Sequence, residues 1–396
     1  MVRQVLRLAL MLCASALALA AIAGAAGPSG HAWAWGDNAD GELGNGSITP
    51  YRGLATPGQV SNLSGVTSVV GGSDFTLALK ADGTVWAWGN GGWGQLGQSR
   101  YGSSTSPIQV PSLNGVRAIA AGDLHALALK SDGSVWAWGF NYYGQVGNGN
   151  SGANVLSPVR VSGLSSAVAI SAGPGGFTSY ALKADGTVWA WGYDGLGQLG
   201  NGRSDENAHP LPVAVSNLTG VVAIGAGSSH ALAVRSDGTV RAWGSNQYGQ
   251  LGAVTTASCT TYKYPCSTTP VTVQNLAGVS TVAGGGNFSL ALKSDGSVWG
   301  WGENGYGQLA TGTATLFGGV TKPTKAKLAS VTAIAAGDEH TLALKSDGSI
   351  WAAGSNHWGQ LGTGNFNDSS NPVRAINLTG GITIGAGLDH SVAAGP

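Results

Sequence analysis

The sequence predicts an all-β fold: a seven-bladed β-propeller of four-stranded antiparallel blades, closed by pairing of its N- and C-terminal strands. Three observations predict it. Glycine is abundant, at 67 of 396 residues, yet 14 Trp and 43% hydrophobic residues remain to build a core. Three motifs occur seven times each, with neighbouring copies 50–58 residues apart. The chain also begins and stops within a repeat. Such a period is typical of a propeller or a solenoid, and short strands joined by glycine turns fit the composition.

The first motif runs from a hairpin turn into a strand and ends in a glycine, here termed the motif glycine. The ten residues KADGTVWAWG at 80–89 recur letter for letter at 183–192, and five variants occupy the other repeats. The Asp-Gly pair predicts a two-residue hairpin loop, which needs positive φ at both positions. Trp86 and Trp88 share one face of the strand that follows, and both faces are apolar. The pattern predicts an inner strand whose Trp side chains pack between blades rather than forming a ligand cage.

Two further motifs repeat in step with the first. A GQLG-type turn runs from GELG at 41–44 to GQLG at 359–362, and a glycine followed by an apolar strand runs from 71–79 to 386–394. The last apolar strand lacks a following partner, and the first WAWG segment, at 31–36, lacks a predecessor. Joined, the two ends complete one repeat. This split favours a ring, because closure removes exposed strand edges, whereas a solenoid would need whole repeats with polar caps.

The repeated set resembles a known family. WGxNxxGQLG, a proline-valine strand and AGxxHxLALKxDGxVWxWG together resemble the regulator of chromosome condensation repeat family over residues 31–396. The resemblance implies a seven-bladed propeller with four-stranded blades and a closure shared by both termini. The founding nuclear member of that family is a nucleotide-exchange factor for a small GTPase and binds nucleosomes. That role is not expected here, because the chain shows no basic tail and no residues that match an exchange wedge.

Exported bacterial members of this repeat class also look similar to the chain. They include an inhibitor of β-lactamase that binds through one propeller face. This precedent favours protein binding, although a fold does not fix a function. The segments that follow the GQLG turns differ in length and charge while the blades stay constant. A fixed scaffold with varied loops is typical of a binding surface.

Residues 1–26 predict a signal peptide. Two arginines precede an apolar run over 8–21, and small residues follow in AIAGAAG, which is the order of a secretory signal. The apolar run is short for a transmembrane helix, and the bulky residue before Cys13 disfavours a lipid anchor. We therefore expect an exported protein, periplasmic or extracellular, whose mature form is a propeller over residues 27–396 with no membrane association. The glycine- and alanine-rich usage suggests a bacterial source.

The charge and the cysteine content limit which partners and ligands are expected. Without residues 1–26 the chain holds 17 Lys+Arg and 19 Asp+Glu, a net charge of −2, and no basic patch is present. Nucleic acid is not an expected partner, because phosphate binding needs clustered cations. Cys259 and Cys266 bracket CTTYKYPC, and two cysteines this close in an exported protein predict a disulfide that closes a small loop. A metal site would need more thiol or imidazole ligands. We expect a monomer.

No residue pattern predicts catalysis, a cofactor or a bound metal. Histidine occupies one repeat position in four blades, but Phe or Thr stands there in the other three, so a packing role is expected. The four are His125, His230, His340 and His390. The run DNADGE holds Asp37, Asp40 and Glu42, which could bind Ca²⁺, but it occurs once and lacks the full ligand spacing. Neither a Ser-His-Asp order nor a metalloprotease or phosphate-binding motif stands out, so we expect no enzyme.

Five aromatic side chains are the candidate binding residues. Four positions past the motif glycine, five of the seven repeats carry an aromatic residue; these are Trp93, Tyr143, Tyr248, Tyr306 and Trp358. If they point outward, they would form a ring on one face that could stack on a sugar or contact a protein. If they point inward, they cap the blades.

Three functional hypotheses follow, in this order. The first is an exported, non-enzymatic propeller that binds a protein partner through one loop face. The second is a carbohydrate or cell-surface binding module that uses the aromatic ring. The third is a hydrolase with a site at the mouth of the central channel, which clustered acidic residues with shifted pKa values would favour. Coplanar exposed aromatics would favour a sugar, whereas a broad loop face of mixed polarity would favour a protein.

Overall fold

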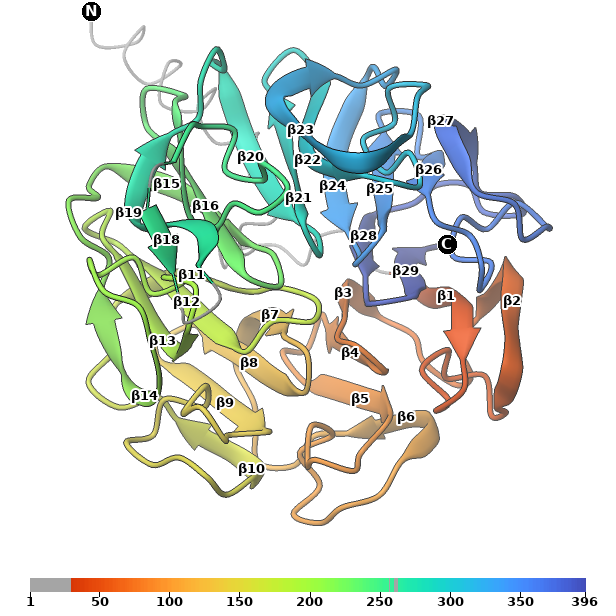
Figure 1. Ribbon diagram of the computed structural model, residues 1–396. Coiled ribbons are helices and arrows are strands. Elements are labelled where there is room, and N and C mark those ends of the chain that lie inside the picture. The colour runs from red at the N-terminus through yellow and green to blue at the C-terminus, as the bar shows by residue number, and fades with distance from the viewer. Residues whose placement is uncertain (1–29, 256, 260–262) are drawn as a thin grey trace, which may run out of the picture.

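The computed structural model describes residues 30–255, 257–259 and 263–396, and in this part of the chain it is all β, with seven blades arranged in a ring (Figure 1). The predicted fold class is confirmed. The predicted signal peptide, residues 1–26, lies outside the described residues. Within the described residues, no helix has the length and apolar character needed to cross a bilayer.

Each blade is an antiparallel sheet whose first strand lies against the first strands of its two neighbours, around the central axis. In blades 1 to 7 the first strands are β3 (Val66–Gly71), β7 (Val116–Ala121), β11 (Ala167–Ala172), β15 (Val221–Ala226), β20 (Val279–Gly284), β24 (Val331–Ala336) and β28 (Thr383–Ala386). The second strands are β4 (Phe75–Lys80), β8 (His125–Lys130), β12 (Thr178–Lys183), β16 (His230–Arg235), β21 (Phe288–Lys293), β25 (His340–Lys345) and β29 (His390–Gly395).

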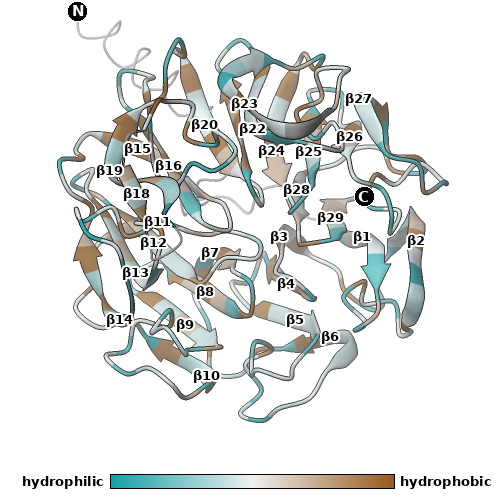
Figure 2. Cartoon of the chain, viewed as in Figure 1, coloured by the Kyte–Doolittle hydropathy of each residue, from teal (hydrophilic) through white to brown (hydrophobic). Residues whose placement is uncertain are grey.

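The outer half of each blade holds two further strands. The third strands are β5 (Val85–Gly89), β9 (Val135–Gly139), β13 (Val188–Asp194), β17 (Val240–Ser245), β22 (Val298–Asn304), β26 (Ile350–Gly354) and β1 (His31–Asn38). The fourth strands, outermost in every blade but the fourth, are β6 (Ser104–Gln109), β10 (Val155–Arg160), β14 (Asp205–Ala214), β19 (Tyr264–Thr272), β23 (Thr315–Lys325), β27 (Ser369–Arg374) and β2 (Thr49–Gln59). Hydrophobic residues lie mainly on the strands, and the connecting loops are mostly neutral or hydrophilic (Figure 2).

The ring is closed in blade 7, where the two ends of the chain pair. β1 pairs antiparallel with β29, so that His31 lies opposite Gly395 and Gly36 opposite His390. This sheet has the order β2-β1-β29-β28, the same as the order of the other blades read from the outside. The closure therefore replaces a hairpin with pairing between the termini, as the split repeat predicted. The VWAWG segment is inside the blade, as expected, but as its third strand; the strand on the axis is the first.

The hairpin between the second and third strands differs from the prediction. The Lys80 N–H donates to the Thr84 carbonyl and the Gly83 N–H donates to the Lys80 carbonyl, which makes a three-residue loop of Ala81, Asp82 and Gly83. Only the glycine has positive φ, at 77°. A type I turn followed by a left-handed glycine gives this geometry. The aspartate acts instead through its side chain, which accepts hydrogen bonds from the Thr84 N–H and hydroxyl.

The second Trp of each motif fastens one blade to the next. In six of the seven interfaces its buried indole N–H donates, at 2.8 Å, to the carbonyl of the second residue of the GQLG-type turn in the preceding blade. The six are Trp35, Trp88, Trp138, Trp191, Trp243 and Trp301, each 0% exposed. Each such bond contributes on the order of 1 kcal/mol net, and burial of the indole contributes more. The first Trp of the motif is half-buried near the hairpin.

The final residue of the GQLG-type turn is glycine because a side chain there would clash with this indole. A Cβ on Gly44 would lie 2.7 Å from Nε1 of Trp88, and a Cβ on any of the five equivalent glycines would lie 2.7–3.0 Å from its indole. The seventh turn ends instead in Ala310, and the Trp it would face is replaced by Ala353; both are buried in one core cluster. Ala310 in place of glycine and Ala353 in place of Trp therefore compensate for each other at the interface between blades 5 and 6.

The four repeated histidines belong to the same interfaces. His125 Nε2 lies 2.9 Å from the Ser179 hydroxyl of the next blade, and that hydroxyl donates to the Gln145 carbonyl. Because the hydroxyl has one hydrogen, the imidazole must donate from Nε2. His230, His340 and His390 repeat the arrangement with Ser289, Ser391 and Thr76. Burial lowers the pKa of these four histidines to about 3 or 4, so they stay neutral.

Two buried acids occupy positions that hold amides elsewhere. Asp194 stands where five blades have Asn; its Oδ1 accepts the Leu199 N–H as those amides do, but its Oδ2 has no partner. Glu42 stands where six blades have Gln and accepts the Asp40 N–H. Burial raises the pKa of Asp194 to about 7 and that of Glu42 to about 8. Each carboxyl therefore carries a proton well above its ordinary range, and it reproduces the acceptor role of the amide that it replaces.

The loop with the two cysteines extends blade 4. β18 (Ala257–Cys259) pairs with β19 and gives this sheet a fifth strand. The Cα atoms of Cys259 and Cys266 lie 5.8 Å apart, within the range that a disulfide spans.

The Ala310–Ala353 pair predicts a coupled effect on stability. Ala353→Trp alone should destabilise the protein by about 1–3 kcal/mol, because the new indole meets the Ala310 methyl. Adding Ala310→Gly should recover that loss, since glycine removes the methyl and tolerates the φ of 56° at this position. Urea unfolding of the two single variants and the double variant would measure the coupling. Strict additivity of the two substitutions would contradict the compensation.

The buried acids predict a pH-dependent stability. Their folded pKa values lie above the ordinary 3.8 and 4.5, so each of these two groups holds more protons in the folded chain than in the unfolded one. Their own contribution to stability should therefore fall as pH rises from about 4 to 8, whereas the four neutral histidines contribute a rise with pH below about 6.5. Asp194→Asn and Glu42→Gln should each flatten that decline and stabilise the protein at pH 8 by on the order of 2 kcal/mol. Thermal unfolding at pH 5 and pH 8 checks this. Equal stabilisation at both values would rule out ionisation as the cause.

Candidate functional site

Seven turns surround the axis at one end of the ring, each joining the first and second strands of a blade; we term them the axial turns. Hydrogen bonds join neighbouring axial turns across every interface. Backbone bonds cross six of them, for example from the Ser73 N–H to the Asp123 carbonyl and from the Leu388 N–H to the Gly72 carbonyl. At the seventh, the Ser228 hydroxyl donates to the Pro174 carbonyl. The axial turns therefore form a closed, rigid platform.

A second layer of loops is attached to this platform. In every blade the residue after the motif glycine donates its N–H to the carbonyl of the last residue of the axial turn, as Asn90 does to Asp74. The surface made by the axial turns and by the first, third and fourth residues after the motif glycine is termed the mouth face. In these positions the sequence repeats poorly, because packing between blades does not fix them.

The chemical type of the mouth-face residues differs from blade to blade: some blades carry aromatic residues there and others carry acidic ones. The last residues of the axial turns, in blades 1 to 7, are Asp74, Leu124, Phe177, Ser229, Asn287, Glu339 and Asp389. The residues directly after the motif glycine are Asn90, Phe140, Tyr193, Ser245, Glu303, Ser355 and Asp37. The third residues are Gly92, Tyr142, Gly195, Gln247, Gly305, His357 and Ala39, and the fourth are Trp93, Tyr143, Leu196, Tyr248, Tyr306, Trp358 and Asp40. None of these positions holds Lys or Arg.

Blades 2 and 3, with the edge of blade 1, carry a continuous group of rings, termed the aromatic sector. It consists of Trp93, Phe140, Tyr142, Tyr143, Phe177 and Tyr193, whose neighbouring ring centroids lie 4.7–6.4 Å apart. Most pairs are tilted or edge-on, and only Phe140 and Tyr142 are stacked, at 12°. Trp93 is 43% exposed and Tyr142 59% exposed, so part of this group is open to a partner.

Blades 5, 6, 7 and 1 carry carboxylates, and with one from blade 2 they form the acidic sector. Its members are Asp37, Asp40, Asp74, Asp123, Glu303, Asp338, Glu339 and Asp389. Burial raises the pKa of Asp74, Asp338 and Asp389 to about 6 and that of Glu339 to about 7, and the repulsion between neighbouring carboxylates adds to each rise. The carboxylates of the sector therefore influence one another's pKa across several blades, and most of them are ionised at neutral pH.

The opposite end of the ring, termed the hairpin face, carries cations as well as carboxylates. Six hairpins between second and third strands each hold a Lys or Arg and, two residues on, an Asp; three of these pairs lie within 4.0 Å, as Lys183 and Asp185 do at 3.6 Å. In five of the six the Lys also lies over a Trp ring at 4.1–5.5 Å. Arg160, Lys325 and Arg374 add positive charge near the hairpin aspartates, so the hairpin face differs in charge from the acidic and aromatic mouth face.

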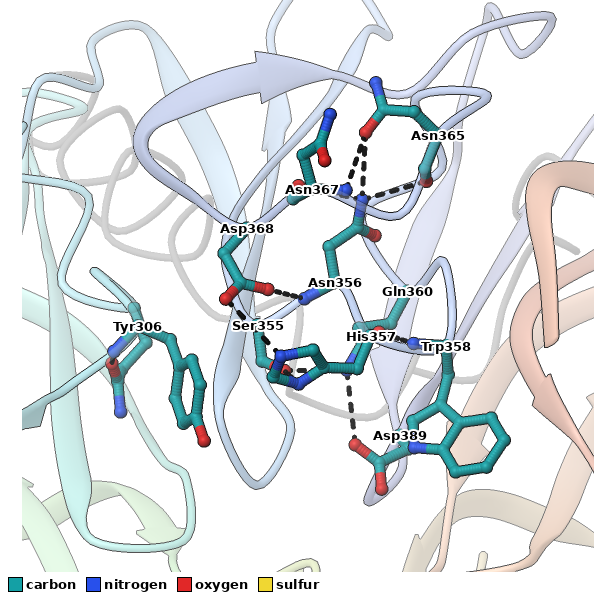
Figure 3. A network of polar contacts seen from close by, with 11 residues as sticks. Tyr306, Ser355, Asn356, His357, Trp358, Gln360, Asn365, Asn367, Asp368 and Asp389 are labelled. Carbon is teal, nitrogen blue, oxygen red and sulfur yellow. Dashed lines mark hydrogen bonds and ion pairs between the residues drawn. The ribbon is translucent and has the colours of Figure 1, made fainter. Parts of the chain in front are cut away.

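Blade 6 places a polar network on the mouth face (Figure 3). His357 Nδ1 lies 3.2 Å from the Ser355 hydroxyl, and its Nε2 lies 3.6 Å from the Asp368 carboxylate. The three residue types are those of a hydrolytic triad, but Ser355 is 1% exposed and its hydroxyl also accepts from Gln360. A nucleophile must be reachable by substrate. The network therefore orients the imidazole, whose ring also contacts Tyr306 edge-on at 5.3 Å, rather than activating the serine.

The residues considered for calcium do not converge on a cation site. Asp37 accepts hydrogen bonds from the Asn38 and Ala39 N–H groups, and Glu42 points to the Asp40 N–H. Among the described residues, no three His, Cys, Asp or Glu side chains gather closely enough to hold a metal ion.

The five aromatic residues predicted from the sequence occupy the same position in five blades and differ in their surroundings. Trp93 and Tyr143 join the aromatic sector, while Tyr306 and Trp358 lie on either side of His357 and Tyr248 lies half-buried in blade 4. Sequence reasoning missed the other four members of the aromatic sector and most of the acidic sector. The signal was available: comparing the seven repeats at the axial turn and directly after the motif glycine separates the aromatic blades from the acidic ones.

Comparison with known families matches the whole propeller. The model of the RCC1-like domain matches residues 174–395, which is more than half of the chain. The model of the regulator of chromosome condensation (RCC1) repeat matches residues 29–79, 82–129 and 132–178, and a second model of that repeat matches residues 66–95 and 116–145.

Individual relatives share the repeats but are longer proteins. The ultraviolet-B receptor UVR8 of Arabidopsis thaliana is 31% identical over 242 residues, which is 60% of this chain and 53% of the receptor. The probable E3 ubiquitin-protein ligase HERC6 of Homo sapiens is 34% identical over 54% of this chain and 21% of the ligase. The human ligase HERC2 is 30% identical over 90% of this chain and 7% of its own length. The chain thus spans about half of the receptor and a small part of the ligases.

Solved structures share the architecture. Prp20p of Saccharomyces cerevisiae superimposes with a TM-score of 0.80, at 24% identity, over 96% of this chain and 93% of Prp20p. Human WBSCR16 superimposes with a TM-score of 0.78, at 24% identity, over 93% and 99%. At these identities the likeness supports the fold alone.

Proposed function

The chain belongs to the regulator of chromosome condensation repeat family, and from this premise we propose that it is an exported, non-enzymatic propeller that binds a protein partner through its mouth face. One observation carries the proposal. The mouth face combines an acidic sector and an aromatic sector on a rigid platform, whereas the hairpin face carries Lys and Arg side chains. Prp20p, which shares the fold, binds Gsp1p and histones, which supports a protein as the class of partner without naming one.

The shape of the aromatic sector favours a protein over a sugar. Sugar binding favours coplanar exposed rings, and here the pairs are mostly inclined at 47–85°. The rings lie beside carboxylates and polar loops, and aromatic anchors within a polar rim are typical of protein interfaces. Nucleic acid is not proposed, because the mouth face offers carboxylates where phosphates would need cations.

A hydrolase is the second candidate, because carboxylates with raised pKa values cluster at the channel mouth. Two features favour binding instead. The cavities described in the structure, one of about 540 Å³ beside residues 160–165 and one beside residues 98–104, contain none of these carboxylates. The only Ser-His-Asp arrangement identified on the described mouth face has a buried serine. Charged groups beside exposed aromatic residues on a rigid surface are typical of recognition by a partner.

Export is part of the proposal and rests on residues 1–26 and on the two cysteines. A disulfide between Cys259 and Cys266 would brace the extended loop of blade 4, and such bonds persist in oxidising compartments. The protein is proposed to act in the periplasm or outside the cell, with no membrane association once the signal is removed.

The mouth face predicts where substitutions abolish capture of the partner. The double variant Trp93→Ala/Tyr142→Ala should recover at least about tenfold less partner than the wild type from the envelope and medium of the source organism, because exposed aromatic anchors each contribute on the order of 1–2 kcal/mol. Both side chains are exposed, so the fold should persist, which circular dichroism checks. The matched control is Lys80→Ala/Lys293→Ala on the hairpin face. If both double variants captured the wild-type set, the mouth face would not be the binding surface.

Export predicts a defined processing event and an oxidised loop. Expressed in full in a bacterial host, the chain should appear in the periplasm or medium with an N-terminus near residue 27. Mass spectrometry should find Cys259 and Cys266 joined, and Cys259→Ser should loosen only the loop of blade 4. An unprocessed chain that stays in the cytoplasm with both thiols free would contradict export.

A further inference from the structure

We propose that the partner docks a segment rich in arginine on the mouth face, with its guanidinium groups paired to the acidic sector and stacked on the aromatic sector. This inference rests on the proposed function and names the chemistry of its partner. It follows from charge complementarity: the mouth face concentrates carboxylates and rings, and its four positions per blade contain neither Lys nor Arg. The nearest arginines on this side, such as Arg52, lie on the outermost strand or the outer loops.

The acidic sector lacks its own counter-ions. Asp37, Asp40 and Asp123 repel the charge on Asp74, and Asp37, Asp74 and Asp338 repel the charge on Asp389. Only His357 opposes these charges, at Asp389. Carboxylates held together without cations favour a ligand that brings positive charge, since the ligand relieves the repulsion as it binds. The rigid axial platform means that this repulsion cannot be relieved by moving the turns apart.

The carboxylates of blade 6 belong to the same unit. The charges of Asp338, Glu303, Asp389 and Asp368 repel the charge on Glu339. Those of Glu303 and Asp123 repel the charge on Asp338. The negative charge therefore continues from blade 5 to blade 2 around the mouth, which is long enough to meet several cationic groups of one extended segment.

The neighbouring aromatic sector selects arginine over lysine. A guanidinium is planar, stacks on aromatic faces and pairs with a carboxylate through two parallel hydrogen bonds. Trp93 lies in the blade that also supplies Asp74, and its ring contacts Phe140 at 5.2 Å. The boundary between the sectors thus offers a ring face and a carboxylate from one blade. A lysine ammonium could use the charge but would gain less from the rings.

A buried amide without a partner lies beneath the acidic sector. Gln308 is 0% exposed and its Nε2 has no partner among the described residues, which is also true of the equivalent Gln145. The equivalent amides of Gln250 and Gln360 donate to the axial-turn residues Asn287 and Asp389 of the next blade. By this equivalence Gln308 is directed at Glu339, where its unpaired donor can orient that carboxylate toward a bound cation.

The test uses a defined probe and the mature protein. The probe is a labelled peptide of alternating glycine and arginine with three arginines, and its matched controls replace arginine by lysine or by citrulline, the neutral isostere. Fluorescence anisotropy at constant ionic strength would measure the dissociation constants. The protein variants are Asp74→Asn/Asp389→Asn in the acidic sector, Tyr142→Ala in the aromatic sector, and Asp237→Asn/Asp295→Asn on the hairpin face as a matched control for charge.

The arginine peptide should bind at least about tenfold more tightly than the citrulline peptide and more tightly than the lysine peptide. Its affinity should rise as pH increases from 5 to 8, because the raised pKa values leave the sector partly protonated at pH 5. The acidic-sector variant should lose both the affinity and most of the pH dependence, Tyr142→Ala should lose the preference for arginine, and the hairpin-face variant should match the wild type.

Equal binding of the citrulline and arginine peptides, an equal loss in the hairpin-face variant, or no binding at millimolar peptide would each overturn the inference. Failure here is distinguishable from failure of the proposed function. If Trp93→Ala/Tyr142→Ala loses the native partner while the arginine peptide does not bind, the mouth face remains the binding surface and only the chemistry of the partner is wrong.

Discussion

One backbone carbonyl in each blade, at the second residue of the GQLG-type turn, holds the next blade in place. In six interfaces it accepts the indole N–H of a fully buried Trp, and in four of these it also accepts a Ser or Thr hydroxyl. In the seventh interface, which lacks the Trp, it accepts the Thr341 hydroxyl. A buried acceptor left unpaired is costly, so each blade needs the donors of its neighbour. The last interfaces form only when the two ends of the chain pair in blade 7. The repeated residues of the chain are those that satisfy this constraint, including Ala310 and Ala353, which change together.

The same constraint leaves the mouth face free to vary. The axial turns are fixed by hydrogen bonds between backbone groups, which place few demands on side chains. The axial positions can therefore carry Asp in one blade, Phe in the next and Ser in a third without loss of the fold. A new binding surface on such a platform needs only changes of side chains. Because the turns are rigid, little backbone entropy is lost when a partner binds. The division into an acidic and an aromatic sector is one outcome of that freedom.

The sequence was sufficient for the architecture because each repeat presents the same packing problem seven times. The ring, the closure between the chain ends and the packing of Trp88 and its equivalents between blades could be predicted from periodicity, whereas the place of the VWAWG strand as the third of each blade was not predicted. The hairpin loop was predicted wrongly because Asp82 acts through its side chain rather than through positive φ. The sectors could not be predicted from any local motif. Asp37, Asp74 and Asp389 become neighbours only because the ring closes, and Phe140 meets Phe177 only across an interface.

The mouth face, and no other surface, is proposed to receive the partner. Hydrogen–deuterium exchange of backbone amides, measured with and without the captured partner, locates the contact. We expect slower exchange in the axial turns and in the residues after the motif glycine, strongest in blades 6, 7, 1 and 2, with the hairpin face unchanged. Slower exchange confined to the hairpins around Asp82, Asp185 and Asp295, or to the outer strands, would contradict it.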